Sequence, residues 1–440
     1  MAPKDKFIVV DVGSTSVHLA EFETPPGSPL ILLAFDSVEY AEAMSEQNRT
    51  EIITDAISAA LETGKFTSRI ANVCISGQSA FMRFVKLPPV TDDESSVKQI
   101  IEFEAKQNVP FPIDEVIWDY QLIGDEDDAD ELEVMFAVIK NDIVESIIAA
   151  VKAAGLKAKV VDFSPAALFN AACANYVGEN DCEMLLNIGG KCTTLLFMEK
   201  GKFFARSIPI AGAAITQQIA KEFSVPVDEA ETLKRRFGFV SLGGAYEDPE
   251  SEVAATISKI VRNVMTRLHG EINRTINIYR SQQKGSKPTR LLLSGGSSTM
   301  AFTDTFFSEK LRMEVNYFNA FPIVNCSTVD TAELEQVAHL LPETVGVALR
   351  ETKNCPVEIN LSTADVRGDD SISRRLPYII GSCISLLSIL GILTLVNFRE
   401  AGNIETAFKL LNQKQEKISL QVKEFKSYIR LEENIEEEYK

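Results

Sequence analysis

Three glycine-containing turns in the sequence have residue types suited to binding phosphate. The first follows an apolar run that ends at Asp11, the second begins at Asn187, and the third follows an apolar run that ends at Ser294. Glycine lets backbone N–H groups turn toward an oxyanion, and serine or threonine hydroxyls add donors. One such turn is weak evidence, but three in one chain indicate a phosphate site. The candidate residues are Asp11, Gly13, Ser14, Thr15, Ser16, Asn187, Gly189, Gly190, Thr193, Gly295, Gly296 and Ser297.

The sequence lacks the glycine loops of two other kinds of nucleotide site. No GxxxxGK[ST] pattern occurs, and no GxGxxG pattern opens a helix after a strand. These absences exclude the P-loop and the common dinucleotide-binding loop. The phosphates would therefore be held from two sides by the glycine turns.

Two of the turns lie inside β-hairpin patterns. Apolar runs flank residues 13–16, and the pattern recurs around residues 187–194, about 175 residues later. The third turn ends an apolar run at residues 291–293 and opens a helical stretch. This repetition predicts two related α/β halves that face each other across a cleft.

The region between the two hairpins has its own pattern. A helix is predicted from residue 92 to 107, strand-like runs at 116–123 and 132–139, and a second helix at 142–154. We interpret this region as a small inserted α+β unit. The acidic stretch at 125–131 is interpreted as a solvated hairpin tip rather than a cation site, because hairpin tips favour Asp.

Helices are predicted to follow the second hairpin, at residues 216–223, 228–236 and 252–282. In the longest of them, apolar residues recur at helical spacing. These helices would form the outer part of the second half. The apolar positions are Ile257, Ile260, Val261, Val264, Leu268, Ile272 and Ile276.

Residues 376–396 are 21 residues without a charge, long enough to cross roughly 30 Å of hydrocarbon as a helix. The alternative is a buried core helix. Three basic residues lie within twenty positions on each side, so the positive-inside rule does not decide the orientation. No export signal precedes the large N-terminal region, which places that region in the cytosol and the C-terminal end in the periplasm.

Residues 397–440 carry a coiled-coil pattern. Eight positions alternate four and three residues apart, and seven of them are apolar. A single polar residue at such a position helps to fix the register. We predict a short periplasmic coiled coil, which allows a homodimer. The eight positions are Ile404, Phe408, Leu411, Gln415, Ile418, Val422, Phe425 and Ile429.

Composition excludes several classes of protein. The net charge of −19 argues against a chain that is held mainly to nucleic acid phosphates. Seven cysteines with no CxxC pair form neither a zinc pattern nor a disulfide framework, and we expect them to be reduced. The three histidines lie in unrelated segments, so no metal site made of protein ligands is predicted.

Residues 9–17 resemble the first phosphate motif of actin-like ATPases, and residues 6–350 are similar to the PilM family of type IV pilus assembly, related to FtsA. The resemblance implies an α/β, actin-like (ribonuclease H-like) two-lobed fold for residues 1–350. It places an FtsA-type inserted subdomain at 80–155 and the outer part of the second lobe at 211–285. Further matches are Arg83 with Leu87 and Pro88, Glu104 and Ala105, Val109 to Phe111, Ala154 to Leu156, Ile215 and Thr216, Ala230 and Glu231 with Lys234, and Leu293 to Gly296.

The resemblance also implies ATP and Mg²⁺ as ligands. Asp11 would help to hold Mg²⁺ through water, and residues 13–16 would cradle the β- and γ-phosphates. Gly189 and Gly190 would close over the phosphates from the other side. The alternative is an actin-like scaffold that binds no nucleotide, because glycine turns also serve backbone geometry alone.

The nucleoside would lie against two other places in the second half. Glu231 and Lys234 would reach the ribose and base, and Gly295 with Gly296 would pass close under the nucleoside. Glu231 and Lys234 are three residues apart on one helix face, so a salt bridge alone would also explain them.

The sequence departs from the family pattern at Asn187, where the second phosphate turn usually begins with Asp. An amide lacks the charge that would help to anchor Mg²⁺ and orient the attacking water, so we expect slow or absent hydrolysis. Asp162 is a candidate for orienting that water. The alternative is that Asp162 is simply an Asp near the start of a helix at Ser164 and Pro165.

Residues 351–375 read as a linker that contains the segment Ile359, Asn360 and Leu361. This segment resembles the short cytoplasmic INL peptide with which the PilN family docks on PilM. The resemblance implies a PilM–PilN-like fusion, in which Val357, Ile359 and Leu361 pack against the N-terminal half and Asn360 bonds the backbone. The alternative is an ordinary final strand edge.

The resemblance implies a type IV pilus assembly or alignment protein of the inner membrane. It would bind ATP and link cytoplasmic motor components to PilN/PilO-like partners and the periplasm. A GspL-like platform protein of type II secretion is the close alternative, although only residues 397–440 follow the span here. An active actin-like ATPase or a sugar-kinase relative is the enzymatic alternative, but the sequence offers no convincing carboxylate base or sugar pocket.

Overall fold

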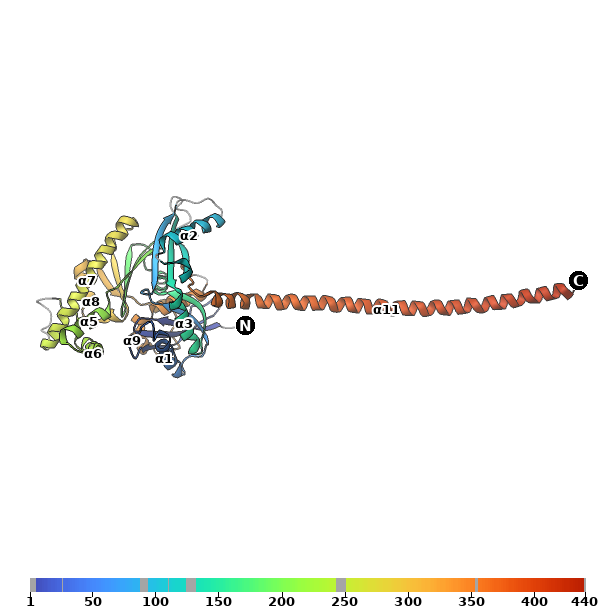
Figure 1. Cartoon of the computed structure of the whole chain (residues 1–440), viewed down its shortest axis with the longest axis horizontal. Coiled ribbons are helices and arrows are strands. Elements are labelled where there is room, and N and C mark those ends of the chain that lie inside the picture. The colour runs from blue at the N-terminus through green and yellow to red at the C-terminus, as the bar shows by residue number, and fades with distance from the viewer. Residues whose placement is uncertain are drawn as a thin grey trace. The chain divides into compact units, whose positions relative to one another are not determined.

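The structure is a computed structural model that describes residues 5–25, 27–87, 94–109, 111–123, 132–242, 251–352 and 355–438. The chain forms two compact units, Met1–Arg367 and Gly368–Lys440 (Figure 1). The described part of the first unit contains three β-sheets, and the second unit is helical.

The first sheet has five strands in the order β3-β2-β1-β4-β8. The predicted hairpin is confirmed, because β1 and β2 pair antiparallel on both sides of the first glycine turn. β4 and β8 lie parallel to their neighbours. Central strands buried on both faces read as continuous apolar runs, as β1 does. The strands are β1 (Asp5–Val12), β2 (Ser16–Thr24), β3 (Ile31–Glu39), β4 (Ile70–Ile75) and β8 (Lys157–Phe163).

The second sheet repeats this design in the order β11-β10-β9-β12-β13. The second predicted hairpin is confirmed, with β9 and β10 antiparallel around the second glycine turn. β12, which ends at the third turn, lies parallel to β9. The strands are β9 (Glu183–Ile188), β10 (Thr193–Glu199), β11 (Lys202–Ile208), β12 (Arg290–Ser294) and β13 (Glu314–Tyr317).

Helices around the second sheet enclose a separate core. The periodicity in residues 252–282 is confirmed as one helix, whose apolar face includes the buried residues Ile257, Val261 and Leu268. The helices of this lobe are α5 (Gly212–Phe223), α6 (Val227–Phe237), α7 (Glu252–Gln282), the 3-10 helix η2 (Gly296–Thr299) and α8 (Thr303–Leu311).

The inserted unit is a three-stranded antiparallel sheet in the order β5-β7-β6 with a small core of its own. The acidic stretch at 125–131 lies outside the described residues. The helix predicted at 142–154 packs against α1 and β8, so its apolar face joins the core of the first lobe. The elements are β5 (Ala80–Leu87), α2 (Glu94–Asn108), η1 (Ile113–Glu115), β6 (Val116–Ile123), β7 (Leu132–Lys140), and, in the first lobe, α1 (Arg49–Glu62) and α3 (Asn141–Ala153).

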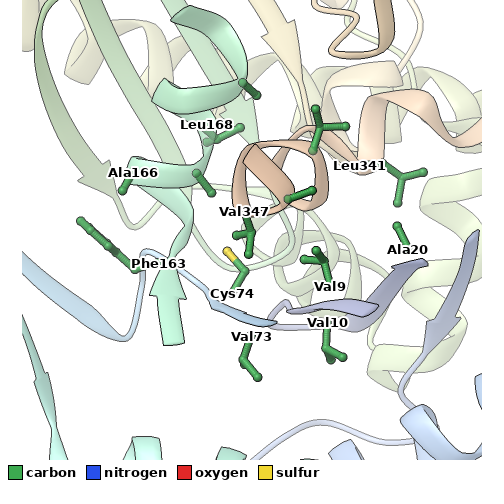
Figure 2. Packing of buried hydrophobic residues seen from close by; sticks show 14 of the residues in the cluster. Val9, Val10, Ala20, Val73, Cys74, Phe163, Ala166, Leu168, Leu341 and Val347 are labelled. Atoms are coloured by element: carbon green, nitrogen blue, oxygen red, sulfur yellow. The ribbon is translucent and has the colours of Figure 1, made fainter. Parts of the chain in front are cut away.

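Two short buried helices cover the face of the first sheet that carries Val9 and Cys74 (Figure 2). They are α4 (Ser164–Ala174) and α10 (Pro342–Ala348). A Cβ at Gly346 would lie 1.8 Å from the carbonyl oxygen of Ala167, so only glycine permits this close approach. The neighbouring short elements are η3 (Phe321–Ile323), α9 (Thr331–Val337), η4 (Ala338–Leu340) and η5 (Leu349–Glu351).

The C-terminal region is one long helix, α11 (Ala364–Glu438). Between residues 380 and 431, it is long and apolar enough to cross a membrane by length and composition, and none of its most hydrophobic window is buried. A buried core helix, which was the alternative for residues 376–396, would have most of this window covered. The helix begins at Ala364, within the stretch predicted as a linker.

Candidate functional site

The structure brings the first two glycine turns into contact. The backbone N–H of Lys191 donates to Ser14 Oγ at 3.0 Å. A Cβ at Gly190 would lie 2.6 Å from the side chain of Thr15, so glycine is required for this approach. We call residues 13–16, 189–191 and 295–297 the glycine-turn junction.

Each hairpin turn is closed in the same way. The N–H of Gly13 donates to the carbonyl of Ser16 at 3.0 Å, and the N–H of Gly189 donates to the carbonyl of Cys192 at 3.1 Å. Among the described residues, no protein group accepts a hydrogen bond from the backbone N–H of Ser14 or Gly190. Such N–H groups are suitable donors for an oxyanion.

The third turn joins the junction through the second one. Gly295 has a positive φ of 84°, and a Cβ there would lie 2.7 Å from Asn187 Oδ1. Ser297 Oγ donates to the carbonyl of Gly189 at 2.9 Å. Thr193 has a different role, since its hydroxyl donates to the carbonyl of Ile210 at 2.6 Å and fixes the loop after β11.

Glu231 and Lys234 bind each other at 2.6 Å. Lys234 Nζ also lies 3.0 Å from the Thr216 hydroxyl, which in turn lies 2.6 Å from Glu231. Burial opposes the charge on Glu231, but the hydrogen bonds from Lys234 and Thr216 outweigh it and lower its pKa. In this structure, Glu231 and Lys234 therefore form a salt bridge with each other, which is the alternative given for them in the sequence analysis.

A salt bridge also joins the two lobes beside the junction. Arg235 of α6 lies 2.9 Å from Glu39 at the end of β3. Both side chains are more than half exposed. This pair and the contact between Ser14 and Lys191 add to the apolar packing between the lobes, in which Phe169 of α4 stacks on Phe203 of β11 with ring centroids 4.2 Å apart.

Two buried carboxyl groups lie beside the junction. Asp11 is at the end of β1, and Glu343 is in the first turn of α10. Glu343 accepts hydrogen bonds from Asn187 Nδ2 at 2.9 Å and from Ser164 Oγ at 3.1 Å. Burial raises the pKa of both carboxyl groups, and the charge of Asp11 raises that of Glu343 further.

Asn187 has a clear function in this cluster, because its amide donates to Glu343. An aspartate at this position has no such donor and would add a third carboxylate. Sequence reasoning missed Glu343. The only local signal is its place after Pro342 at a helix start, where acidic residues are common for their effect on the helix dipole.

Asp162 is fully buried at the end of β8. It is paired in register with Cys74 of β4, and Cys74 is in turn paired with Asp11 of β1. Its carboxylate lies 3.4 Å from Arg350, which is itself only 9% exposed. Burial raises the pKa of Asp162 to about 6, and the nearby Arg350 opposes this increase. These contacts satisfy the buried carboxylate, and a role for Asp162 in orienting water stays a prediction.

The segment singled out near the end of the first unit is packed into that unit. Val357, Ile359 and Leu361 are 2%, 0% and 0% exposed, and they join the core of the first lobe. The backbone N–H of Leu361 donates to the carbonyl of Val161 on β8 at 2.7 Å. We call residues 357–361 the docked segment.

Polar contacts fix the docked segment on both sides. Asn170 of α4 makes two hydrogen bonds to the backbone of Val357, at 2.9 and 3.0 Å. Asn360 Oδ1 accepts from the N–H of Val161 at 3.3 Å, and its own N–H donates to Asp119 of β6 at 2.8 Å. Asn360 therefore bonds the backbone, as its side chain was expected to do.

Arg350 connects this segment to the rest of the lobe. Its guanidinium donates to the carbonyl of Ile359 as well as pairing with Asp162. The next residue, Glu351, pairs with Lys159 at 2.7 Å. Sequence reasoning missed Arg350, Asn170 and Asp119, because nothing in the local sequence marks them.

The residues at the junction suit a phosphate chemically, but the turns are in contact with each other. Among the described residues, no group of three or more His, Cys, Asp and Glu side chains could hold a metal ion. A role for the buried Asp11 in holding Mg²⁺ through water stays a prediction.

Comparison with solved structures identifies the fold. A structure described as the "PilM-PilN type IV pilus biogenesis complex" matches with 21% identity and a TM-score of 0.68, covering 80% of this chain and all of the other. EutJ from Carboxydothermus hydrogenoformans matches with 18% identity and a TM-score of 0.43, covering 79% of this chain and 90% of the other. MreB5 of Spiroplasma citri bound to AMPPNP matches with 12% identity and a TM-score of 0.40, covering 79% and 96%.

The two lobes thus have the actin-like ATPase fold, as expected from the sequence. A family model described as type IV pilus assembly protein PilM matches residues 9–352, which is well over half of the chain. The chain belongs to the PilM family of type IV pilus assembly proteins.

Proposed function

We propose that this protein is a membrane-anchored platform of type IV pilus assembly, with a PilM-type domain and a PilN-like segment in one chain. The docked segment carries the proposal. It occupies a site on the first lobe, directly before the long helix that begins at Ala364. The similar solved structure is a PilM–PilN complex, so a segment of this kind has a natural place on this fold.

The contacts of the docked segment match those of a specific recognition site. Alternate side chains, Val357, Ile359 and Leu361, enter the core, while backbone groups bond to β8, α4 and β6. Backbone bonds with alternating buried side chains are the usual means of binding an extended peptide. Covalent connection makes this docking intramolecular and raises its effective concentration.

Residues 376–396 would anchor the platform in the inner membrane, with the PilM-type domain in the cytoplasm. The apolar side chains beyond the span are exposed at the heptad positions, for example Leu411 at 66% and Phe425 at 72%. A periplasmic coiled-coil partner would cover them. We propose PilN/PilO-like proteins or a second copy of the chain as that partner.

ATP would act on this platform as a conformational ligand. The glycine-turn junction offers donors to phosphates, and binding there requires separation of the lobes, which breaks the contact of Lys191 with Ser14. A ligand that binds only the separated form shifts the population toward that form. With Asn187 in place of an acidic residue, we propose slow or absent hydrolysis.

The short helix α10 gives a route from the junction to the docked segment. Glu343 in its first turn bonds Asn187 of the second lobe, and Arg350, two residues beyond its last turn, holds Ile359. The helix is buried throughout and closely packed against α4 at Gly346. Under this proposal, a shift at one end of α10 would move the other end.

Calorimetry of MgATP binding beside a phosphate-release assay tests this proposal on the full chain in lipid nanodiscs. We expect binding with little release from the wild type. Asn187→Asp should raise the release rate, because a carboxylate helps to hold Mg²⁺ and orient water. MgATP should also change hydrogen exchange at Leu361, as α10 moves.

Wild-type turnover of the order of 1 s⁻¹ or more, as in working phosphoryl-transfer enzymes, would contradict the ligand role. If MgATP gives no heat of binding, the alternative of an actin-like scaffold that binds no nucleotide would be favoured. Lys221→Gln is a suitable control variant, since Lys221 is exposed on α5 and forms no hydrogen bond or ion pair with the described residues of the junction.

A further inference from the structure

A cavity lies in the first lobe beside the glycine-turn junction, and Lys191 of the second lobe also lines it. It has a volume of about 500 Å³ and lies between the loop before α1, the helix α3 and the inserted sheet. This volume is within the range of roughly 300–1,000 Å³ that is usual for small-molecule sites. It shares Gly13, Ser14 and Lys191 with the junction region, but none of the residues that hold the docked segment.

Three cationic side chains from distant parts of the chain converge on this cavity. They are Arg49 of α1, Lys140 at the end of β7, and Lys191 of the second turn. Among the described residues none of them pairs with a carboxylate. The chain has a net charge of −19, so a cavity lined by three such cations differs in charge from the protein as a whole.

The partners of these cations are neutral groups. Arg49 donates to Ser146 Oγ at 3.3 Å, and Lys191 Nζ donates to the carbonyl of Met44 at 3.4 Å. Lys140 Nζ lies 5.5 Å from the centre of the Phe111 ring. Among the described lining residues, Glu46 is the one acidic side chain. A concave surface lined mostly by one sign of charge attracts ligands of the opposite sign.

Apolar side chains form the remainder of the lining. Ile139 and Ile147 are buried, and Ile143 lies on the same face of α3. Phe111 stays 38% exposed although it lines the cavity. A ligand with an apolar body and an anionic group would cover this surface and pair with the cations.

We propose that this cavity binds a small amphipathic anion, with its apolar body against Ile143 and Phe111 and its charged group between Arg49, Lys140 and Lys191. The chemical class is an aryl or alkyl phosphate, sulfonate or carboxylate. This proposal does not depend on nucleotide binding at the glycine-turn junction.

The test uses para-trifluoromethylphenyl phosphate as a probe and the full chain in lipid nanodiscs. Fluorine NMR line broadening measures its binding, with empty nanodiscs as the reference. We expect Lys140→Gln and Arg49→Gln each to weaken binding about tenfold. Lys152→Gln is the matched control, because Lys152 is exposed on α3 and does not line the cavity. Unchanged fluorescence of Trp118 verifies that each variant is folded.

Two competitors complete the test. The neutral analogue para-trifluoromethylbenzyl alcohol should bind much more weakly than the phosphate ester, and inorganic phosphate at equal concentration should not displace the ester. Equal binding by Lys140→Gln, Arg49→Gln and wild type would overturn the proposal.

Discussion

The glycine-turn junction and the site of the docked segment differ in how their polar groups are satisfied. Beside the junction, Asp11 and Glu343 are buried, no cationic partner for either is found among the described residues, and burial raises the pKa of each. At the docked segment, the buried Asp162 is paired with Arg350. An unpaired buried charge is costly, whereas a paired and hydrogen-bonded one is tolerated.

This difference indicates that the junction, rather than the docked segment, is the region suited to a change of conformation. The docked segment completes the core of the first lobe, and removing it would expose three fully buried side chains. The junction is held by a few polar contacts and carries groups that a phosphate or a cation would stabilise. The comparison predicts large effects for changes at the docked segment and smaller, condition-dependent effects at the junction.

The largest effect is expected for Ile359→Asp, because Ile359 is fully buried. Loss of a buried isoleucine side chain costs about 2–5 kcal/mol, and a buried carboxylate adds a desolvation cost. We expect the segment to leave its site, so that the amide of Leu361 exchanges at least a hundred times faster. Glu358→Ala is the control, since Glu358 is exposed between two buried neighbours. Unchanged exchange at Leu361 would refute docking as a stabilising contact.

A somewhat smaller effect is expected for Arg350→Ala. This variant leaves Asp162 buried without its partner, and breaking a buried pair in this way costs roughly 3–5 kcal/mol. Urea unfolding of the full chain in nanodiscs, followed by the fluorescence of Trp118, measures the loss. The double variant with Asp162→Asn should recover part of it, because the orphaned charge is removed. No recovery would mean that Arg350 acts only through the carbonyl of Ile359.

A pH-dependent effect is expected for Glu343→Gln. A carboxyl group whose pKa is raised on folding binds more protons in the folded state, so the free energy of unfolding falls as the pH rises above its usual pKa of about 4.3. Glutamine keeps the acceptor for Asn187 but cannot ionise. The variant should therefore lose less stability than wild type between pH 5 and neutral pH.

Urea unfolding at several pH values measures this difference. Glu333→Gln is the control, because Glu333 is an exposed residue of α9. Parallel pH profiles for wild type and Glu343→Gln would show that Glu343 does not titrate on folding.

The smallest effect is expected for Glu39→Gln, which removes the salt bridge between the lobes. The pair of Glu39 and Arg235 is exposed, so its contribution is roughly 0–1 kcal/mol and decreases with salt. If the lobes must separate to admit ATP, the variant should bind MgATP up to about fivefold more tightly. Glu62→Gln, an exposed residue at the end of α1, is the control. Weaker binding of MgATP by Glu39→Gln would contradict separation of the lobes.

Some of the candidate residues stay predictions after the structure is known. The contact between the turns at Ser14 and Lys191 agrees with their expected proximity, but ligand roles for Glu231 and Lys234 compete with the salt bridge that the two form. Glu343 could not be predicted, because an acidic residue after Pro342 looks like any helix start. Its importance comes from Asn187, 156 positions earlier in the chain.

The sequence by itself determined the local elements. The alternation of apolar residues around Gly13 and Gly189 specifies two hairpins, and the helical spacing in residues 252–282 specifies one long helix, because both patterns depend on near neighbours. The charge-free run at 376–396 likewise needs no tertiary context to be recognised.

Only the tertiary structure decided which of these elements meet. The close packing of α10 on α4 places Glu343 beside Asn187 and Arg350 beside Asp162. The burial that shifts the carboxyl pKa values also comes from that packing. Such contacts join residues that are far apart in sequence, and their energies depend on distance and desolvation, which no local pattern encodes.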